Sequence, residues 1–153
     1  MLRILLTALL LLAPVSTQAW AKTPSKQEVR KQQKEHTDLG TRAGIYWRSV
    51  RWSDATAASI FIENPDDRLL FQKWLTEQAR IHKITDAQVV RVEVSREYTK
   101  PKDGHIRTAT VTVSLEGFTM PEQVLKTQVL KQGWYRTSGG WFVSWSPPPP
   151  PKP

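Results

Sequence analysis

The sequence contains no cysteine. Disulfide bonds are therefore excluded as a source of stability, and no cysteine is available to carry a lipid anchor behind an export signal. A chain of 153 residues is long enough to bury one hydrophobic core, but not comfortably two. We therefore expect a single domain that is held together by core packing alone.

Long hydrophobic runs are scarce, and the main one lies at the very start. The apolar run Ile4–Ala13 follows a short basic stretch and is about half of the roughly 20 residues that a membrane span needs. Ala19-Trp20-Ala21 then has the small residues of a cleavage site. We expect residues 1–21 to be a signal peptide, and the protein to be periplasmic or extracellular and soluble after cleavage near Ala21. An uncleaved membrane anchor is the alternative.

Motifs for common catalytic chemistry are also missing. The sequence has no Gly-rich phosphate loop, no nucleophile elbow and no Ser-His-Asp set. The histidines, His36, His82 and His105, are far apart, and none has a second histidine two to four residues away, a spacing typical of metal sites. We therefore expect neither an enzyme nor a bound metal or cofactor.

Basic residues outnumber acidic ones, with 22 Lys and Arg against 14 Asp and Glu and a formal net charge of +8. Such a charge favours contact with anionic lipid, acidic polysaccharide or nucleic acid. Export makes nucleic acid the least expected of these partners. Because acids alternate with basic residues along much of the chain, a soluble cationic surface is the alternative.

The two ends of the exported chain differ in composition from a folded core. Residues 22–38 form a polar basic arm in which Val29 is the only sizeable apolar residue. We expect a flexible spacer or a solvated helical lead-in, with an electrostatic tether to an anionic surface as the functional alternative. Residues 147–153 are nearly all proline and predict a polyproline II tail, either a stiff end or a docking peptide. The folded domain is expected between them, at residues 39–146.

Three helices are predicted in the first half of this domain. Ser53-Asp54 provides a cap for the second helix, and Asn64-Pro65 starts the third, which should end near His82 or Lys83. Helical spacing gives each helix one apolar stripe. The stripes comprise Leu39, Ala43, Tyr46, Trp47 and Val50; Ala57, Ala58 and Phe61; and Leu70, Phe71, Trp74, Leu75 and Gln78.

Two strands with regular alternation follow the helices. Val90, Val92 and Val94 should share the inward face of the first strand. The stretch Lys100–Gly104 has the residues of a turn. In the next strand, apolar residues at every second position predict one buried face. The hydroxyl residues between them predict a solvent-exposed face on the other side. The inward set is Ala109, Val111, Val113 and Leu115.

Two further strands complete the expected sheet. In the third strand, Leu125, Thr127 and Val129 are out of phase with Gln132 and Trp134. This mismatch predicts a β-bulge near Leu130-Lys131 that would bend the sheet. Ser138-Gly139-Gly140 predicts a hairpin turn into the last strand, because glycine readily adopts the positive φ that such turns need. The last strand should place Trp141, Val143 and Trp145 on one side and Phe142 on the other.

This order of elements resembles the NTF2-like (cystatin-like, α+β cone) superfamily in its short secreted form, over residues 39–145. The resemblance implies an α+β fold, in which three N-terminal helices pack on a bent four-stranded antiparallel sheet. It also implies, for many members, a small-ligand pocket between helices and sheet. The residues that carry it are Tyr46-Trp47, Trp52-Ser53-Asp54-Ala55, Ile84-Thr85-Asp86, Gln132-Gly133-Trp134 and Gly139-Gly140-Trp141-Phe142-Val143.

Some members of that superfamily are enzymes that resemble ketosteroid isomerase. Such a site needs a carboxylate inside an apolar cone, near a hydrogen-bond donor. Asp86 is the candidate carboxylate, and Tyr46 or Tyr98 the candidate donor. We regard this as the least expected function, since an Asp between a helix and a strand ordinarily caps or turns.

Aromatic residues are the remaining functional candidates. Trp47, Phe71, Trp74 and Trp134 either fill the core or line an open cone that takes a small apolar ligand. Aromatic residues left outside would mark a partner surface. Our first expectation is a non-catalytic exported module that binds an envelope protein or an anionic surface, and the alternative is a small-molecule carrier or sensor. A homodimer through the sheet face is compatible with both.

Overall fold

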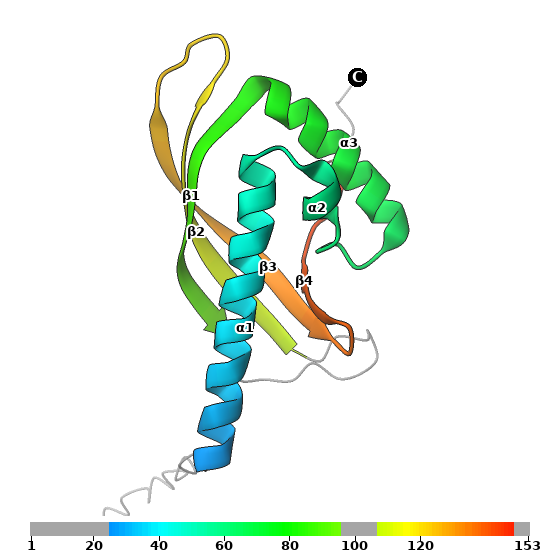
Figure 1. Cartoon of the computed structure of the whole chain (residues 1–153), viewed down its shortest axis with the longest axis vertical. Helices are drawn as coiled ribbons and strands as arrows, with labels where there is room; N and C mark the ends of the chain where they lie inside the picture. The colour runs from blue at the N-terminus through cyan, green and yellow to red at the C-terminus, as the bar shows by residue number, and fades with distance from the viewer. Residues whose placement is uncertain (1–24, 96–106, 149–153) are drawn as a thin grey trace, which may run out of the picture.

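The computed structural model describes residues 25–95 and 107–148. The expected signal peptide, the turn Lys100–Gly104, His105, Tyr98 and most of the proline tail lie outside these ranges. Three helices precede four strands, so the expected α+β class is confirmed (Figure 1). The elements are α1 (Lys26–Arg51), α2 (Ala55–Ser59), α3 (Pro65–Ile81), β1 (His82–Val94), β2 (Arg107–Thr119), β3 (Lys126–Thr137) and β4 (Gly140–Val143).

The strands form one antiparallel sheet in the order β1-β2-β3-β4. The sheet curls around the helices: α1 lies across it, and α2 and α3 lie beside the C-terminal half of α1 (Figure 1). The β2–β3 end of the sheet extends past the C-terminal end of α1 (Figure 1). This leaves one end of the concave face without a covering helix.

Helix α1 begins at Lys26, thirteen residues earlier than the sequence pattern predicted, since order was expected near Leu39. Its start is fixed by a capping box: Glu28 N donates to Ser25 Oγ, and Ser25 N donates to the Glu28 carboxylate. Glu35 is buried in this supposedly solvated stretch. The flexible spacer is therefore wrong for residues 26–38, and the helical lead-in is correct.

The predicted caps of the next two helices are confirmed. Asp54 accepts a hydrogen bond from Ala57 N at 2.9 Å, and Asn64 accepts one from Asp66 N at 3.0 Å. In α3 the inward stripe is narrower than predicted, because Phe71 and Leu75 are buried but Leu70 is 50% exposed. The helix ends at Ile81, and β1 follows without an intervening loop.

Strand β2 matches its prediction, but β1 does not. The four predicted inward residues of β2 are all buried. In β1, Val89 pairs with Val113 and Arg91 pairs with Thr112, so Val90 is an extra residue at a bulge and is 60% exposed. The bulge moves Val90 off the inward face, which Val92 then continues.

The bulge predicted near Leu130-Lys131 is absent, because β3 pairs with β2 in unbroken register from Lys126 to Arg136. The irregularities are instead in β1, between Ile84 and Asp86 and between Val89 and Arg91. With no bulge in β3, Leu130, Gln132 and Trp134 share the concave face. Val129 consequently points to the outer face and is exposed.

The β3–β4 hairpin is confirmed, with Thr137 paired to Gly140 across the turn. Gly140 has a φ of +121°, and a Cβ at this position would lie 3.2 Å from the Arg42 guanidinium. Glycine is therefore required here for its backbone freedom and its small size. The largest fully buried side chains of the core are Trp134, Trp141, Phe71, Leu39, Val111 and Val113.

Candidate functional site

Three of the four aromatic candidates, Trp47, Phe71 and Trp134, belong to the buried core. Phe71 and Trp134 are fully buried, and the Tyr46 ring contacts both, with ring centroids 6.2 and 5.8 Å apart. The Phe61 ring packs edge-on against Trp134 at 6.1 Å. These rings fill the middle of the cone, so Phe71 and Trp134 have no free surface for a ligand.

Gln132 is a polar residue inside this aromatic cluster that the sequence analysis placed in a strand but did not name as a functional candidate. Its Oε1 atom accepts hydrogen bonds from Trp47 Nε1 at 3.1 Å and from Trp134 Nε1 at 3.0 Å. Burial raises the pKa of Tyr46 to about 12, although a hydrogen bond with Gln132 opposes this rise. The sequence signal that could have identified Gln132 is its position two residues before Trp134, which places both side chains on the same face of a strand.

Trp47 and Trp74 line a cavity of about 230 Å³ between α1, α3 and the sheet. We call it the apolar chamber. Neither Phe71 nor Trp134 lines it, so only two of the four aromatic candidates meet at one site. Most of its wall is apolar or aromatic, and Arg51, His82 and Lys83 supply basic groups. The other lining residues are Tyr46, Val50, Ser53, Leu75, Gln78, Ala79, Ile84, Leu115 and Leu130.

A second hollow of about 320 Å³ adjoins the chamber, since both are lined by His82, Lys83, Ile84 and Leu115. We call it the basic groove. Its lining residues lie on β1, β2 and β3, toward the β2–β3 connection. Its remaining lining residues are Glu116, Gly117, Phe118, Thr119, Lys126 and Gln128.

Strand pairing orders the side chains along this face. Each inward row crosses β1, β2 and β3, and the rows change from apolar to basic toward the β2–β3 turn. The rows are Val89–Val113–Leu130, then Ala87–Leu115–Gln128, then Ile84–Gly117–Lys126. The chamber and the groove are therefore one surface with an apolar part and a charged part.

The opposite end of the cone holds a buried ion cluster. The Glu35 carboxylate accepts from Arg107 and, at 2.6 Å, from Arg136. Arg107 also donates to the Ser95 carbonyl oxygen at 2.7 Å. A hollow of about 260 Å³ adjoins Arg107 and His36. Because Glu35 is paired with two guanidinium groups, the cluster fastens α1 to β2 and β3.

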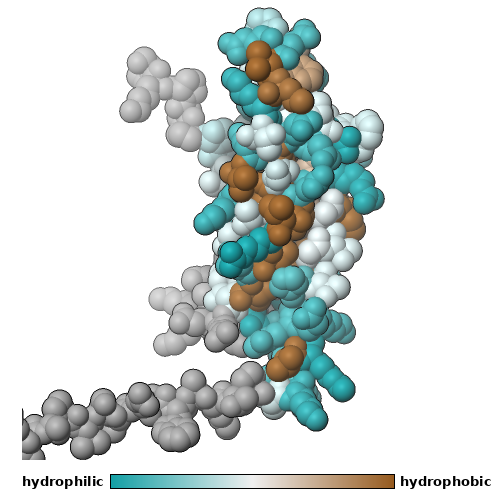
Figure 2. All heavy atoms as spheres, turned by 90° about the vertical axis from the view of Figure 1, so that its left-hand side faces the viewer, coloured by the Kyte–Doolittle hydropathy of each residue, from teal (hydrophilic) through white to brown (hydrophobic). Residues whose placement is uncertain are grey.

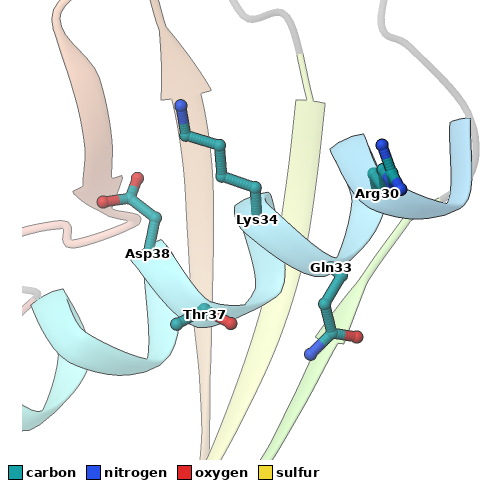
Figure 3. Close-up of a pocket in the computed structure, with 5 residues that line it drawn as sticks. All are labelled: Arg30, Gln33, Lys34, Thr37 and Asp38. Atoms are coloured by element: carbon teal, nitrogen blue, oxygen red, sulfur yellow. The ribbon is translucent and has the colours of Figure 1, made fainter. Parts of the chain in front are cut away.

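Another hollow, of about 480 Å³, is a shallow surface on α1. Figure 3 shows its lining side chains: Lys34 and Asp38 project from one side of the helix, and Gln33 from the other. Among the described residues, only this one helix lines it: Arg30, Gln33, Lys34, Thr37 and Asp38. A surface on a single helix does not enclose a ligand, so its volume alone does not make it the better candidate.

Asp86, the candidate carboxylate, is partly exposed and contacts Arg51 and Gln88. It is in β1 opposite Glu116, its side chain is 42% exposed, and it pairs with Arg51 at 3.5 Å and with Gln88 at 2.8 Å. Within residues 25–95 and 107–148, His, Cys, Asp and Glu form no group of three that could hold a metal ion. His36 Nε2 donates to the Val92 carbonyl, and His82 hydrogen-bonds with Thr119.

The outer surface carries dispersed hydrophobic residues. Figure 2 shows them as an interrupted band down the β1 side of the molecule, with polar residues between. The large exposed hydrophobic residues of the outer sheet face and the β2–β3 connection are Val90, Met120, Val124, Leu125 and Val129. The band is broken by polar rows such as Arg91–Thr112–Lys131, so this face is mixed rather than continuously apolar.

The described part of the chain has no helix that is both long enough and apolar enough to cross a membrane. Comparisons with protein-family models, curated proteins and solved structures find no match to this chain. The candidate function therefore rests on the chamber and the groove themselves.

Proposed function

We propose that this protein is an NTF2-like cone protein that binds one small apolar molecule at the wide end of the cone, without converting it chemically. The observation that carries the proposal is the apolar chamber, in which Trp47 of α1 faces the same cavity as Trp74 of α3 and Ile84 of β1. Ligand pockets are typically concave, mostly aromatic or aliphatic, and supplied with a few polar groups.

The size of the chamber limits the ligand. Pockets for drug-sized molecules have volumes of about 300–1,000 Å³, whereas the chamber measures about 230 Å³. The bound apolar part of the ligand should therefore be short.

We place this binding activity in the exported chain that follows Ala21. N-terminal sequencing of the protein recovered outside the cytoplasm tests that location.

The uncharged fluorescent probe N-phenyl-1-naphthylamine tests the binding site. We expect a saturable rise in its fluorescence, with one probe bound per protein. Ala79→Phe should abolish the rise, because Ala79 lines the chamber and a phenyl ring would occupy it. Thr76→Phe is the matched control, since it adds the same ring at an exposed position of α3. Non-saturable fluorescence, or equal binding by both variants, would refute the proposal.

A second candidate function is contact with an envelope protein. Trp52 favours it, because this large side chain is 71% exposed at the end of α1 and the Arg51 guanidinium lies 5.4 Å from its ring. Exposed Trp and Arg residues are frequent anchors in protein interfaces. Crosslinking of the mature protein in its own envelope should give one discrete adduct that Trp52→Ala removes; an unchanged adduct would exclude Trp52 as the anchor.

A further inference from the structure

The apolar chamber opens into a groove with a different electrostatic character. Both are lined by His82 and Lys83, and the groove adds Lys126 toward the β2–β3 connection. Glu116 is an acidic group on the groove wall, and it accepts a hydrogen bond from the Thr85 hydroxyl. The groove therefore has two lysines against one carboxylate, directly beside an aromatic cavity.

Gly117 lies at this junction, where the β1 backbone packs closely against β2. It lies between Ile84 of β1 and Lys126 of β3 in one row of the sheet, on the concave side. Any side chain at Gly117 would meet the Lys83 carbonyl oxygen, because a Cβ there would lie only 2.3 Å from it. The row thus consists of Ile84, Gly117, which has no side chain, and Lys126. An alkyl chain that extends out of the chamber along this row would reach the Lys126 ammonium group.

Lys126 and Lys83 differ in how freely they can contact a ligand. Both are exposed. Lys83 Nζ donates to the Ala79 carbonyl at the end of α3, which leaves it two further N–H donors. Lys126 has no ion pair within the described part of the chain. Its ammonium group is the more available partner for an anion.

We propose that the ligand of this site is an amphipathic anion: a short alkyl or acyl chain that fills the apolar chamber and ends in an anionic group held by Lys126 and Lys83. This inference rests on the proposed function and adds the chemical class of its ligand. Charge complementarity supports it, since a cationic rim beside an apolar cavity discriminates an anionic end group from a neutral one of the same length.

Displacement of N-phenyl-1-naphthylamine by decanoate and by decanol tests the inference, at concentrations below those at which either compound aggregates. The two compounds share the same chain length and differ in the charge of the end group. We expect decanoate to displace the probe about tenfold more effectively than decanol. Lys126→Gln should remove most of this preference, and Lys83→Gln should reduce it.

Lys34→Gln is the matched control, because it removes the same charge from an exposed position of α1, at the other end of the molecule. It should keep the full preference for decanoate. Equal displacement by decanoate and decanol would overturn the anionic ligand and leave the apolar site intact. Equal loss in Lys34→Gln and Lys126→Gln would also overturn it, since net charge alone would then explain the preference. Absence of probe binding would instead overturn the proposed function.

Discussion

Trp47 of α1 and Trp134 of β3 donate their indole N–H groups to the same atom, Oε1 of Gln132. One acceptor therefore satisfies two indoles from different elements. Both indoles belong to the buried core, and Trp47 also borders the apolar chamber. This shared hydrogen bond connects the packing of the cone to the wall of the candidate site.

Gln132→Leu should destabilise the protein by about 2 kcal/mol, because buried donors that lose their acceptor each cost roughly 1–3 kcal/mol. Urea unfolding followed by tryptophan fluorescence measures the change. Gln128→Leu is the control, since Gln128 is an exposed residue of the same strand. Equal effects of the two substitutions would show that the shared acceptor does not matter for stability.

Trp134→Ala should cost about 3–5 kcal/mol, as expected for removal of a large buried aromatic side chain. Trp134 is 1% exposed, whereas Trp52 is 71% exposed. Trp52→Ala should therefore change the unfolding free energy by less than about 1 kcal/mol. A loss below 1 kcal/mol for Trp134→Ala would contradict its place in the core.

Glu35→Gln should destabilise the protein by about 3 kcal/mol, because it leaves the buried Arg107 guanidinium without its counter-charge. The same measurement on Glu77→Gln, an exposed position of α3, should show little change. If both variants unfold at the same urea concentration, the buried cluster does not fasten α1 to the sheet.

The two alanine substitutions Gly140→Ala and Gly44→Ala should act in opposite directions. Gly140 has a positive φ and the Arg42 side chain close by, so alanine there should cost about 1–2 kcal/mol. Gly44 lies inside α1 and a Cβ would meet nothing within 4 Å. Alanine at this helical position should stabilise by about 0.5–1 kcal/mol, and thermal unfolding of both variants measures the signs.

The unfolding free energy should fall at alkaline pH because of Tyr46. Burial raises the pKa of Tyr46 to about 12 in the folded protein, whereas an unfolded tyrosine has a pKa of about 10. The folded state therefore holds this proton more tightly. The resulting stabilisation is complete below pH 10 and is lost between about pH 10 and 12, by about 2–3 kcal/mol.

Tyr46→Phe provides the comparison, since every other titratable group is present in both proteins. Tyr135 also titrates in both, with a pKa that burial and the neighbouring Glu63 carboxylate raise to about 12. The variant should lose less stability between pH 10 and 12, as measured by urea unfolding at each pH. Parallel curves for the two proteins would show that Tyr46 does not contribute.

Local signals in the sequence were sufficient for much of the fold. Asp54 and Asn64 cap helices as predicted, and the alternation of Ala109 to Leu115 identified a strand with one buried face. The glycine pair at Gly139-Gly140 located the hairpin. Each of these features depends on residues within a few positions of one another, so the sequence itself carries the required physics.

The candidate site was only partly predictable. Trp47 and Trp74 were identified from their aromatic stripes, but stripes do not distinguish a residue that fills the core from one that lines a cavity. Phe71 and Trp134 have the same pattern and are buried. Lys83 and Lys126 lie in different strands, and only the strand register brings them to the same groove.

The sequence by itself determined where α2, α3, β2 and the β3–β4 hairpin form, because caps, turns and alternation are short-range effects. The tertiary structure decided the early start of the folded domain, since Glu35 is buried by arginines from β2 and β3. It also decided that the bulge occurs at Val90 instead of Leu130. Both outcomes depend on contacts between residues far apart in the chain, whose burial outweighs the local hydrophobic pattern.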